Sequence, residues 1–415
     1  MENAFYCGLD LGSEMVQASY YSWKAREPES ISISGDQQEF LMPAVLCKKT
    51  ETSEWLAGEE AVRCASKGGG ELVGGLFGRL LSGEEAVIGE KKYPARQLAE
   101  QYLKWLLKMI EQCTGTAKFT VLAVTLPEAA QSLRAVLADI FSGLGIPKDR
   151  LLFLSHTECF AYYTVNMPPE LWMNDVALFD YNEESFYFER LMFARKRQPL
   201  PVMSERQDLT EELKLQDIAR ETPERKSYWF YNLAMQQLQK QPVTTVYVTG
   251  SGFAGGWPEE ALRALCNGRR VFFGQNLYTK GACYAAKMAG DKSDRNFIFL
   301  NDNMIRDTIS LRIYRDARNG YMELARAGTD YRQVGRKLRM ILDDTNEIEF
   351  LVDNVLKKGL VHEVMILDNL VKRENKTIRL ELTLFYADRD TPVVQLRDIG
   401  FGAAKATGRI WEQIL

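Results

Sequence analysis

The stretch FYCGLDLGSEMVQASY, residues 5–20, decides the fold. An apolar strand runs into Asp10, passes a tight turn with Gly12 and Ser13, and continues as a second strand of apolar and aromatic residues. This pattern predicts a β-hairpin. A carboxylate beside a turn whose backbone N–H groups face outward can also hold a hydrated metal ion and the phosphates that accompany it. The same residues are typical of an ordinary hairpin turn, so this stretch alone leaves both interpretations open.

The pattern returns in residues 175–191, DVALFDYNEESFYFERL. Here too a strand is followed by an aspartate, Asp180, then by a turn, the hydroxyl of Ser185 and a second strand. Asp180 lies 170 residues after Asp10. Self-similarity of this kind predicts a duplicated domain, in which the two turns could face one cleft.

Residues 10–19 resemble the first phosphate loop of the actin and Hsp70 superfamily, and their D-x-G-S-x-M-V-x-A spacing is close to that of actin. Residues 180–185 stand where the superfamily has its second phosphate loop, and residues 244–256, TTVYVTGSGFAGG, resemble its adenosine loop. The resemblance implies bound ATP or ADP with Mg²⁺, the metal lying at Asp10 and Asp180. The cofactor-binding positions that it implies are Asp10, Gly12, Ser13, Asp180, Ser185, Gly250, Ser251, Gly252 and Phe253.

The fold implied by the resemblance is α/β: a two-lobed actin/Hsp70-like ATPase fold built from duplicated ribonuclease H-like domains. Its lobes would span residues 1–168 and 169–290. Within them, periodicity and capping residues predict helices. The expected helices cover residues 94–113, 128–144, 157–165, 209–219, 229–239, 258–265 and 275–287.

From residue 295 the composition changes to short alternating strands separated by turns such as Asn319-Gly320, which predicts a β-sandwich over residues 295–415 with a terminal helix. Its position resembles that of the Hsp70 substrate-binding β-domain, without the helical lid. An unknown protein or peptide partner is therefore expected to bind there. The expected strands are residues 297–300, 308–314, 321–325, 337–342, 348–352, 361–367, 377–386 and 393–399.

The chain departs from the superfamily at the residue that orients the attacking water molecule in ATP hydrolysis. Leu154 stands where Hsp70 has a catalytic Glu and actin has Gln, and leucine cannot orient a water molecule. His156 and Glu158 follow closely and could substitute if the alignment shifts by two to four residues, although His156 is also a natural helix-start residue. No catalytic residue is assigned.

The second loop departs as well. Asn182, Glu183 and Glu184 replace the consecutive glycines that let backbone approach a phosphate. A carboxylate about 4 Å from a phosphate charge costs on the order of 1 kcal/mol in water and about 4 kcal/mol at an effective dielectric of 20. In the first loop, Glu14 and Gln17 stand where actin has Gly and a phosphate-contacting Lys.

Composition limits the class of protein. A net charge of -4 gives no general field for nucleic acid, and no run of eighteen apolar residues predicts a membrane span. The seven scattered cysteines are typical of small buried side chains in a reducing compartment, so we expect a cytoplasmic protein without a disulfide framework. The glycines of residues 67–70 and 73–75 lack the Lys-Ser/Thr of a P-loop and predict a flexible loop.

These observations favour a pseudo-ATPase that senses nucleotide, or works without it, as a protein-interaction module. Two alternatives stay open. The first is an active but divergent Hsp70-like ATPase with chaperone-like coupling to the β-domain. The second is an actin-like filament-forming protein or a sugar kinase of the same fold, although the catalytic Asp that sugar kinases need is not found.

Overall fold

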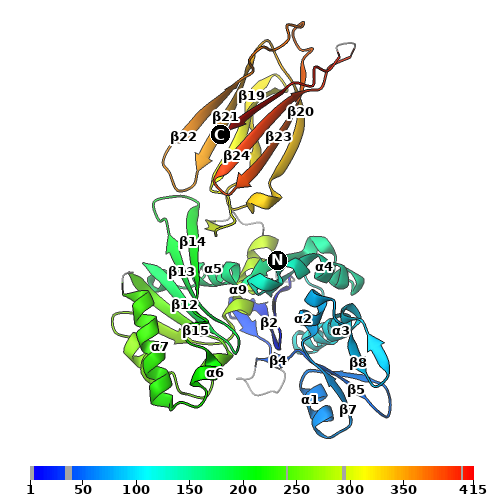
Figure 1. The fold of residues 1–415 in the computed structure, drawn as a ribbon, viewed down its shortest axis with the longest axis vertical. Coiled ribbons are helices and arrows are strands. Elements are labelled where there is room, and N and C mark those ends of the chain that lie inside the picture. The colour runs from blue at the N-terminus through cyan, green and yellow to red at the C-terminus, as the bar shows by residue number, and fades with distance from the viewer. Residues whose placement is uncertain (1–3, 33–39, 240–241, 292–295, 403–404) are drawn as a thin grey trace. The chain divides into compact units, whose positions relative to one another are not determined.

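The computed structural model describes residues 4–32, 40–239, 242–291, 296–402 and 405–415, and its fold is mixed α/β with several sheets. The chain forms two compact units (Figure 1). Unit 1 comprises Met1–Glu189 and Gln207–Asp294, and unit 2 comprises Arg190–Arg206 and Arg295–Leu415. The boundary expected at residue 295 lies outside the described residues. The sequence does not predict that residues 190–206 belong with the C-terminal part.

The hairpin predicted from residues 5–20 is confirmed, because β1 (Tyr6–Leu11) and β2 (Met15–Ser22) pair antiparallel. They belong to a sheet with the order β11-β10-β1-β2-β3, in which β1, β10 and β11 run parallel. β1 and β10 are almost wholly buried, as parallel strands usually are. The other strands of this sheet are β3 (Glu27–Ser30), β4 (Met42–Pro43), β10 (Val121–Leu126) and β11 (Leu151–Ser155).

The second predicted hairpin is also present, formed by β12 (Asp175–Tyr181) and β13 (Phe186–Phe193). Its sheet has the order β16-β15-β12-β13-β14-β17, with β12, β15 and β16 parallel. The first five strands of this order, β16-β15-β12-β13-β14, repeat the order β11-β10-β1-β2-β3 of the first sheet. The remaining strands are β14 (Leu200–Asp208), β15 (Val243–Thr249), β16 (Arg270–Phe273) and β17 (Phe297–Leu300).

Helices of unit 1 cover these sheets. Residues of α3 and α4 share one hydrophobic core with the first sheet, and residues of α7 and α8 share another with the second. The helices are α3 (Ala95–Thr114), α4 (Arg134–Gly143), α5 (His156–Val165), α7 (Pro223–Leu238), α8 (Glu259–Leu265) and α9 (Leu277–Gly290). All six were expected, but α7 begins six residues before the expected residue 229, and the helix predicted from residue 128 begins as the 3-10 helix Glu128–Leu133.

The helix predicted over residues 209–219 is wrong except for the short α6 (Leu215–Ile218). Its first residues serve the second hairpin instead. The Leu209 N–H donates to the Phe186 carbonyl, and the Phe186 N–H donates to the Thr210 hydroxyl, 3.0 Å away. These bonds hold the backbone beside β13 rather than in a helix.

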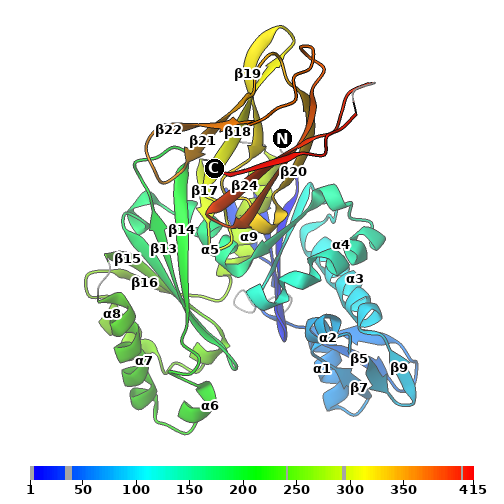
Figure 2. The same ribbon diagram turned by 45° about the horizontal axis from the view of Figure 1, so that its top comes forward.

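Two helices, α5 and α9, pack against each other at the centre of unit 1 (Figures 1 and 2). A side chain added at Gly281 of α9 would collide with the carbonyl of Cys159 in α5, so the two backbones are in direct contact. The hydroxyl of Thr279 donates to the Gly8 carbonyl of β1 at 3.0 Å. Helix α9 is therefore fixed against both α5 and the first sheet.

A small subdomain lies within unit 1, and part of it differs from the sequence prediction. Residues 70 and 73, both expected in flexible glycine-rich loops, are the two ends of a strand that pairs with β5, and residues 55–57 form a strand on the other side of β5. Hydrogen bonding to a central strand outweighs the local glycine content here. The elements are β5 (Leu46–Lys49), β6 (Trp55–Ala57), α1 (Gly58–Ser66), β7 (Gly70–Val73), α2 (Leu76–Ser82), β8 (Ala86–Ile88) and β9 (Lys91–Tyr93).

Unit 2 contains two four-stranded antiparallel sheets, β19-β18-β21-β22 and β20-β23-β24-β25, whose inner residues form one hydrophobic core. In addition, β14 pairs in parallel with β17. All eight predicted strands of this region are confirmed. The strands are β17 (Phe297–Leu300), β18 (Asp307–Arg315), β19 (Arg318–Ala325), β20 (Gly335–Ile341), β21 (Glu347–Asn354), β22 (Leu360–Ile366), β23 (Arg379–Asp388), β24 (Thr391–Asp398) and β25 (Ile410–Ile414).

Two details of unit 2 correct the sequence analysis. The expected terminal helix is wrong, because residues 410–414 form β25, which pairs with β24 and buries Trp411 in the core. The turn expected at Asn319-Gly320 lies instead at Asp316 and Ala317, both of which have positive φ, of 52° and 61°. Two left-handed residues give the turn type whose twist suits a two-residue hairpin.

Candidate functional site

The two aspartates that the sequence singled out both lie in unit 1, near the carboxyl ends of equivalent strands. Asp10 is the fifth residue of β1, and Asp180 is the sixth of β12. Their surroundings are largely closed to water, since 15% of the Asp10 side chain and 7% of Asp180 are exposed. Buried carboxylates need hydrogen-bond donors or cations nearby.

Asp10 is hydrogen-bonded to His156, whose Nε2 lies 2.8 Å from Asp10 Oδ1. His156 is the first residue of α5, and the start of that helix is fixed by a capping box in which Ser155 and Glu158 exchange side-chain and backbone hydrogen bonds. The sequence analysis named His156 as a helix-start residue and as a possible polar substitute. The structure shows it at the helix start and in contact with Asp10.

Asp180 accepts hydrogen bonds from Tyr278 and Asn182. The Tyr278 hydroxyl, from the first turn of α9, donates to Asp180 Oδ2 at 2.7 Å, and Asn182 Nδ2 donates to Oδ1 at 2.8 Å. The rings of His156 and Tyr278 stack with their centres 3.9 Å apart and their planes within 8°. One continuous chain of side chains therefore links the two aspartates: Asp10, His156, Tyr278 and Asp180. The sequence analysis missed Tyr278.

We expect Tyr278→Phe to lower the free energy of unfolding of unit 1 by about 1.5–3 kcal/mol, because hydrogen bonds to a buried charged acceptor are worth about that much. Urea unfolding followed by circular dichroism measures it. Tyr228→Phe in α7 is the matched control, since Tyr228 is 64% exposed and should change stability by less than about 0.5 kcal/mol. Equal stability of both variants would show that the bond to Asp180 contributes nothing.

The glycine loop after β15 supports the second hairpin. A Cβ on Gly250, which has a φ of +106°, would collide with the backbone of Tyr181, and one on Gly252 would lie 2.8 Å from the Tyr181 ring. Phe253 is 1% exposed and packs against Tyr181 with ring centres 5.3 Å apart. Phe253 is therefore a core residue. Ser251 is exposed, and its N–H donates to Asn182 Oδ1 at 3.2 Å.

The first turn is more open, with Gly12 half-buried and Ser13 and Glu14 exposed. Leu154 is 4% exposed within β11, so the position that resembles the catalytic Glu of Hsp70 is a core position. Glu158 serves the start of α5 and lies 3.6 Å from Arg134 Nη2. Of the two possible substitutes, His156 contacts Asp10, one of the predicted metal-binding aspartates.

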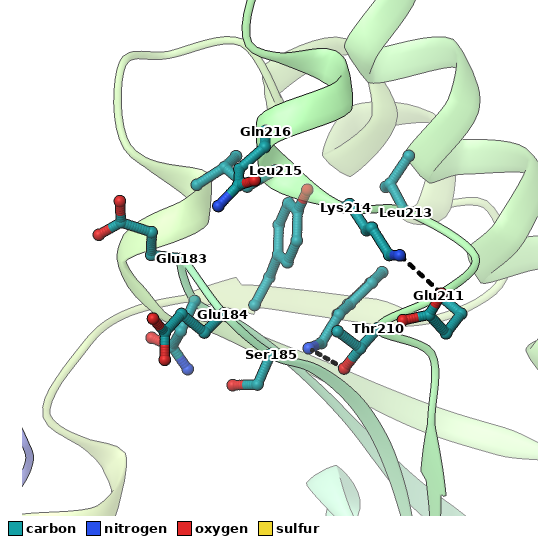
Figure 3. Close-up of a pocket in the computed structure, with 12 residues that line it drawn as sticks. Glu183, Glu184, Ser185, Thr210, Glu211, Leu213, Lys214, Leu215 and Gln216 are labelled. Carbon is teal, nitrogen blue, oxygen red and sulfur yellow. Dashed lines mark hydrogen bonds and ion pairs between the residues drawn. The ribbon is translucent and has the colours of Figure 1, made fainter.

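A pocket of about 250 Å³ lies beside the turn of the second hairpin (Figure 3). It is lined by residues 181–186 and by most of residues 210–216. Glu183, Glu184 and Glu211 contribute three carboxylates, and Lys214, the one cationic lining residue, is ion-paired to Glu211 at 2.6 Å. The pocket that adjoins Ser185 is therefore acidic, which disfavours phosphate.

Within the described ranges of the chain, no helix has the length and apolar character needed to cross a membrane. In the same ranges, no three or more His, Cys, Asp and Glu side chains come together in a group that could hold a metal ion.

The structure thus defines a mixed α/β protein in which two sheets share one strand order and two aspartates are hydrogen-bonded to protein side chains. Residues 27–302 match the model of a family of unknown function, DUF5716 (C-terminal), and residues 304–415 match a domain of unknown function, DUF8552. Because the first match covers more than half of the chain, the chain belongs to the DUF5716 family. A search of curated proteins found no match.

Proposed function

We propose that this chain is a divergent actin/Hsp70-like protein whose nucleotide site has degenerated, and that it acts as a non-hydrolysing protein-interaction module. The observation that carries the proposal is the chain of Asp10, His156, Tyr278 and Asp180. Protein side chains occupy both carboxylates that the superfamily would turn toward Mg²⁺ and phosphate.

The repeated strand order supports the two-lobed part of the proposal. Both sheets place a hairpin next to two parallel strands in the same sequence of neighbours, and each hairpin carries an aspartate near the end of its first strand. The close packing of α5 and α9 joins the two halves at their centre. A duplicated ribonuclease H-like core has these properties.

The residues present do not fit a magnesium nucleotide. Binding the metal through Asp10 Oδ1 would compete with His156, and binding it through Asp180 Oδ2 would compete with Tyr278. Each hydrogen bond to a charged group is worth about 1.5–3 kcal/mol. The acidic pocket beside Ser185 would add repulsion toward phosphates. Leu154 offers no group to orient water. We therefore derive no hydrolytic step for this chain.

The test is a calorimetric titration with ATP and ADP, with and without magnesium, together with a phosphate-release assay. We expect turnover far below the ~1 s⁻¹ at the lower end of ordinary enzymes, and the same background for wild type and Asp10→Ala. Turnover of several per second that Asp10→Ala abolishes would overturn the proposal and favour the active ATPase. Tight nucleotide binding without turnover would assign the chain to nucleotide sensing.

Unit 2 is the part that we propose binds a protein partner. Its edge strand β22 exposes several apolar side chains: Leu360 is 56% exposed, Val361 51% and Ile366 55%. An edge strand can pair with an extended segment of another chain, while an apolar face can dock a folded partner.

We expect docking of a folded partner rather than capture of extended peptides. The measurement is fluorescence anisotropy with a panel of labelled extended apolar peptides. It needs the full chain, because β14, from the middle of the sequence, pairs with β17 inside unit 2. We expect no saturable binding to any peptide. Saturable binding that Val364→Lys weakens would show that β22 captures peptides.

A further inference from the structure

Two cysteines of the small subdomain come from helix α1 and from strand β5, against which that helix packs. Cys47 is in the central strand β5 and is fully buried, whereas Cys64 is in the last turns of α1 and is partly exposed. Both sulfurs lie at the turn formed by Gly69 and Gly70, and Cys64 is close enough to contribute to the raised pKa of Cys47. The pair therefore joins a buried cysteine to a partly exposed one.

The glycine-rich turn between α1 and β7 is shaped around these sulfurs. A Cβ on Gly69 would lie 3.1 Å from the Cys64 sulfur, and one on Gly70 would lie 2.8 Å from the Cys47 sulfur and collide with the Lys48 carbonyl. Neighbouring glycines thus each face one of the two sulfurs. This close approach explains glycines that the sequence analysis assigned to a flexible loop.

The other cysteines lack this combination of contact and access. Cys7 and Cys283 lie near each other, but both are fully buried and each donates its thiol hydrogen to a backbone carbonyl. Cys113 and Cys266 are exposed, and Cys159 is buried against α9. Among the seven cysteines, all of which lie in the described ranges, only Cys47 and Cys64 pair a partly exposed residue with a neighbouring thiol.

We propose that Cys47 and Cys64 form a redox modification site, at which a peroxide-class oxidant joins the two residues in a disulfide. The Cys64 sulfur attacks one peroxide oxygen, the O–O bond breaks, and Cys64 becomes a sulfenic acid while one water leaves. The Cys47 sulfur then attacks the Cys64 sulfur, the S–O bond breaks, and the thiol proton of Cys47 leaves with the hydroxyl as a second water. Two thiols are oxidised and one peroxide is reduced.

The surroundings set the order of these steps. Burial, followed by the proximity of Cys64, raises the pKa of Cys47 to about 11, so Cys47 is a protonated thiol at neutral pH. A buried thiol does not meet the oxidant, and Cys64, which is partly exposed, reacts first. Cys47 is the resolving residue.

The disulfide would tie α1 to β5. Helix α1 begins at Gly58, whose Cα lies against the Trp105 ring of α3, so α1 is already held at its start by packing. Oxidation would fix its other end covalently to the sheet. Because a cross-link restricts the unfolded chain, the oxidised protein should unfold at a higher urea concentration than the reduced protein.

The experiment treats the reduced full chain with hydrogen peroxide and analyses it by intact mass and by non-reducing peptide mapping. We expect a mass lower by two hydrogen atoms, a peptide pair linking Cys47 to Cys64, and reversal by dithiothreitol. Cys64→Ser should lose the mass change and the linked peptides, while Cys266→Ser, at an exposed unpaired cysteine, should keep both.

Several results would overturn the proposal. They are a wild-type chain that gains only oxygen atoms, a linked pair other than Cys47 and Cys64, or cross-links only between separate chains. The peptide map of the wild-type protein decides this without any variant, so a misfolded Cys64→Ser would not affect the conclusion. Cys64→Ala offers a second substitution of the same partly exposed position.

Discussion

Gly281→Ala should destabilise unit 1 by about 3 kcal/mol, at the upper end of what overpacking usually costs. The new Cβ would collide with the carbonyl oxygen of Cys159, and all three of its nearest neighbours are backbone atoms of that residue. A flexible side chain could move aside, but the backbone of α5 cannot without separating from α9. Urea unfolding followed by circular dichroism measures the loss.

Gly78→Ala is the matched control for this prediction. Gly78 is also a helical glycine, in α2, but a Cβ there meets no atom within 4 Å. Alanine favours the helix over glycine, so this variant should gain up to about 1 kcal/mol. If Gly281→Ala were as stable as Gly78→Ala, the contact between α5 and α9 would not be the constraint that we describe.

Much of the secondary structure could be predicted because it depends on local pattern. Both Asp-turn hairpins follow from apolar strands that run into an aspartate and a turn, and the eight C-terminal strands follow from alternation of apolar and polar residues. The predictions fail where pairing with a strand from another part of the chain determines the local structure. Residues 70–73 contain glycine yet pair with β5, and residues 410–414 become a strand because β24 offers them an edge.

Only part of the candidate site could be predicted from the sequence. Asp10 and Asp180 stand in recognisable turns, but the groups that close the site come from far along the chain. His156 is 146 residues from Asp10, and Tyr278 is 98 residues from Asp180. Nothing near Tyr278 in the sequence indicates its role, because the contact exists only once α9 packs at the centre of unit 1.

The structure gives Phe253 a packing role that the sequence does not indicate. The resemblance to the superfamily's adenosine loop implies a binding role, but the Phe253 ring is buried in an aromatic cluster formed by Tyr181 at the end of β12, Phe230 in α7 and Trp257 just before α8. Such a cluster is a property of tertiary packing. We therefore expect substitutions of Phe253 to act on stability, as truncation of a buried aromatic does.

Asp398→Asn should have the largest effect in unit 2, about 3–5 kcal/mol, because removing one partner of a buried ion pair leaves the other uncompensated. Asp398 is 3% exposed at the end of β24. Arg373 donates to both of its oxygens, at 3.2 and 2.9 Å, and Gly400 N and the Thr407 hydroxyl donate at 2.9 and 2.7 Å. An amide cannot accept all these bonds.

The same contacts give this prediction a pH dependence. Burial would raise the pKa of Asp398, but the hydrogen bonds from Gly400, Thr407 and Arg373 outweigh it and lower the pKa to about 2. The ionised form is therefore favoured in the folded state, and the stability it contributes, about 2 kcal/mol, is complete above about pH 4 and is lost as the pH falls toward 2. Urea unfolding at pH 7, 4 and 2 measures the difference in free energy of unfolding between wild type and Asp398→Asn. We expect this difference to decrease mainly between pH 4 and pH 2. Asp316→Asn, at an exposed turn residue, should match wild type at each pH. If the difference in free energy of unfolding between wild type and Asp398→Asn stayed constant down to pH 2, the charge of the Asp398 carboxylate would not be the source of this stability.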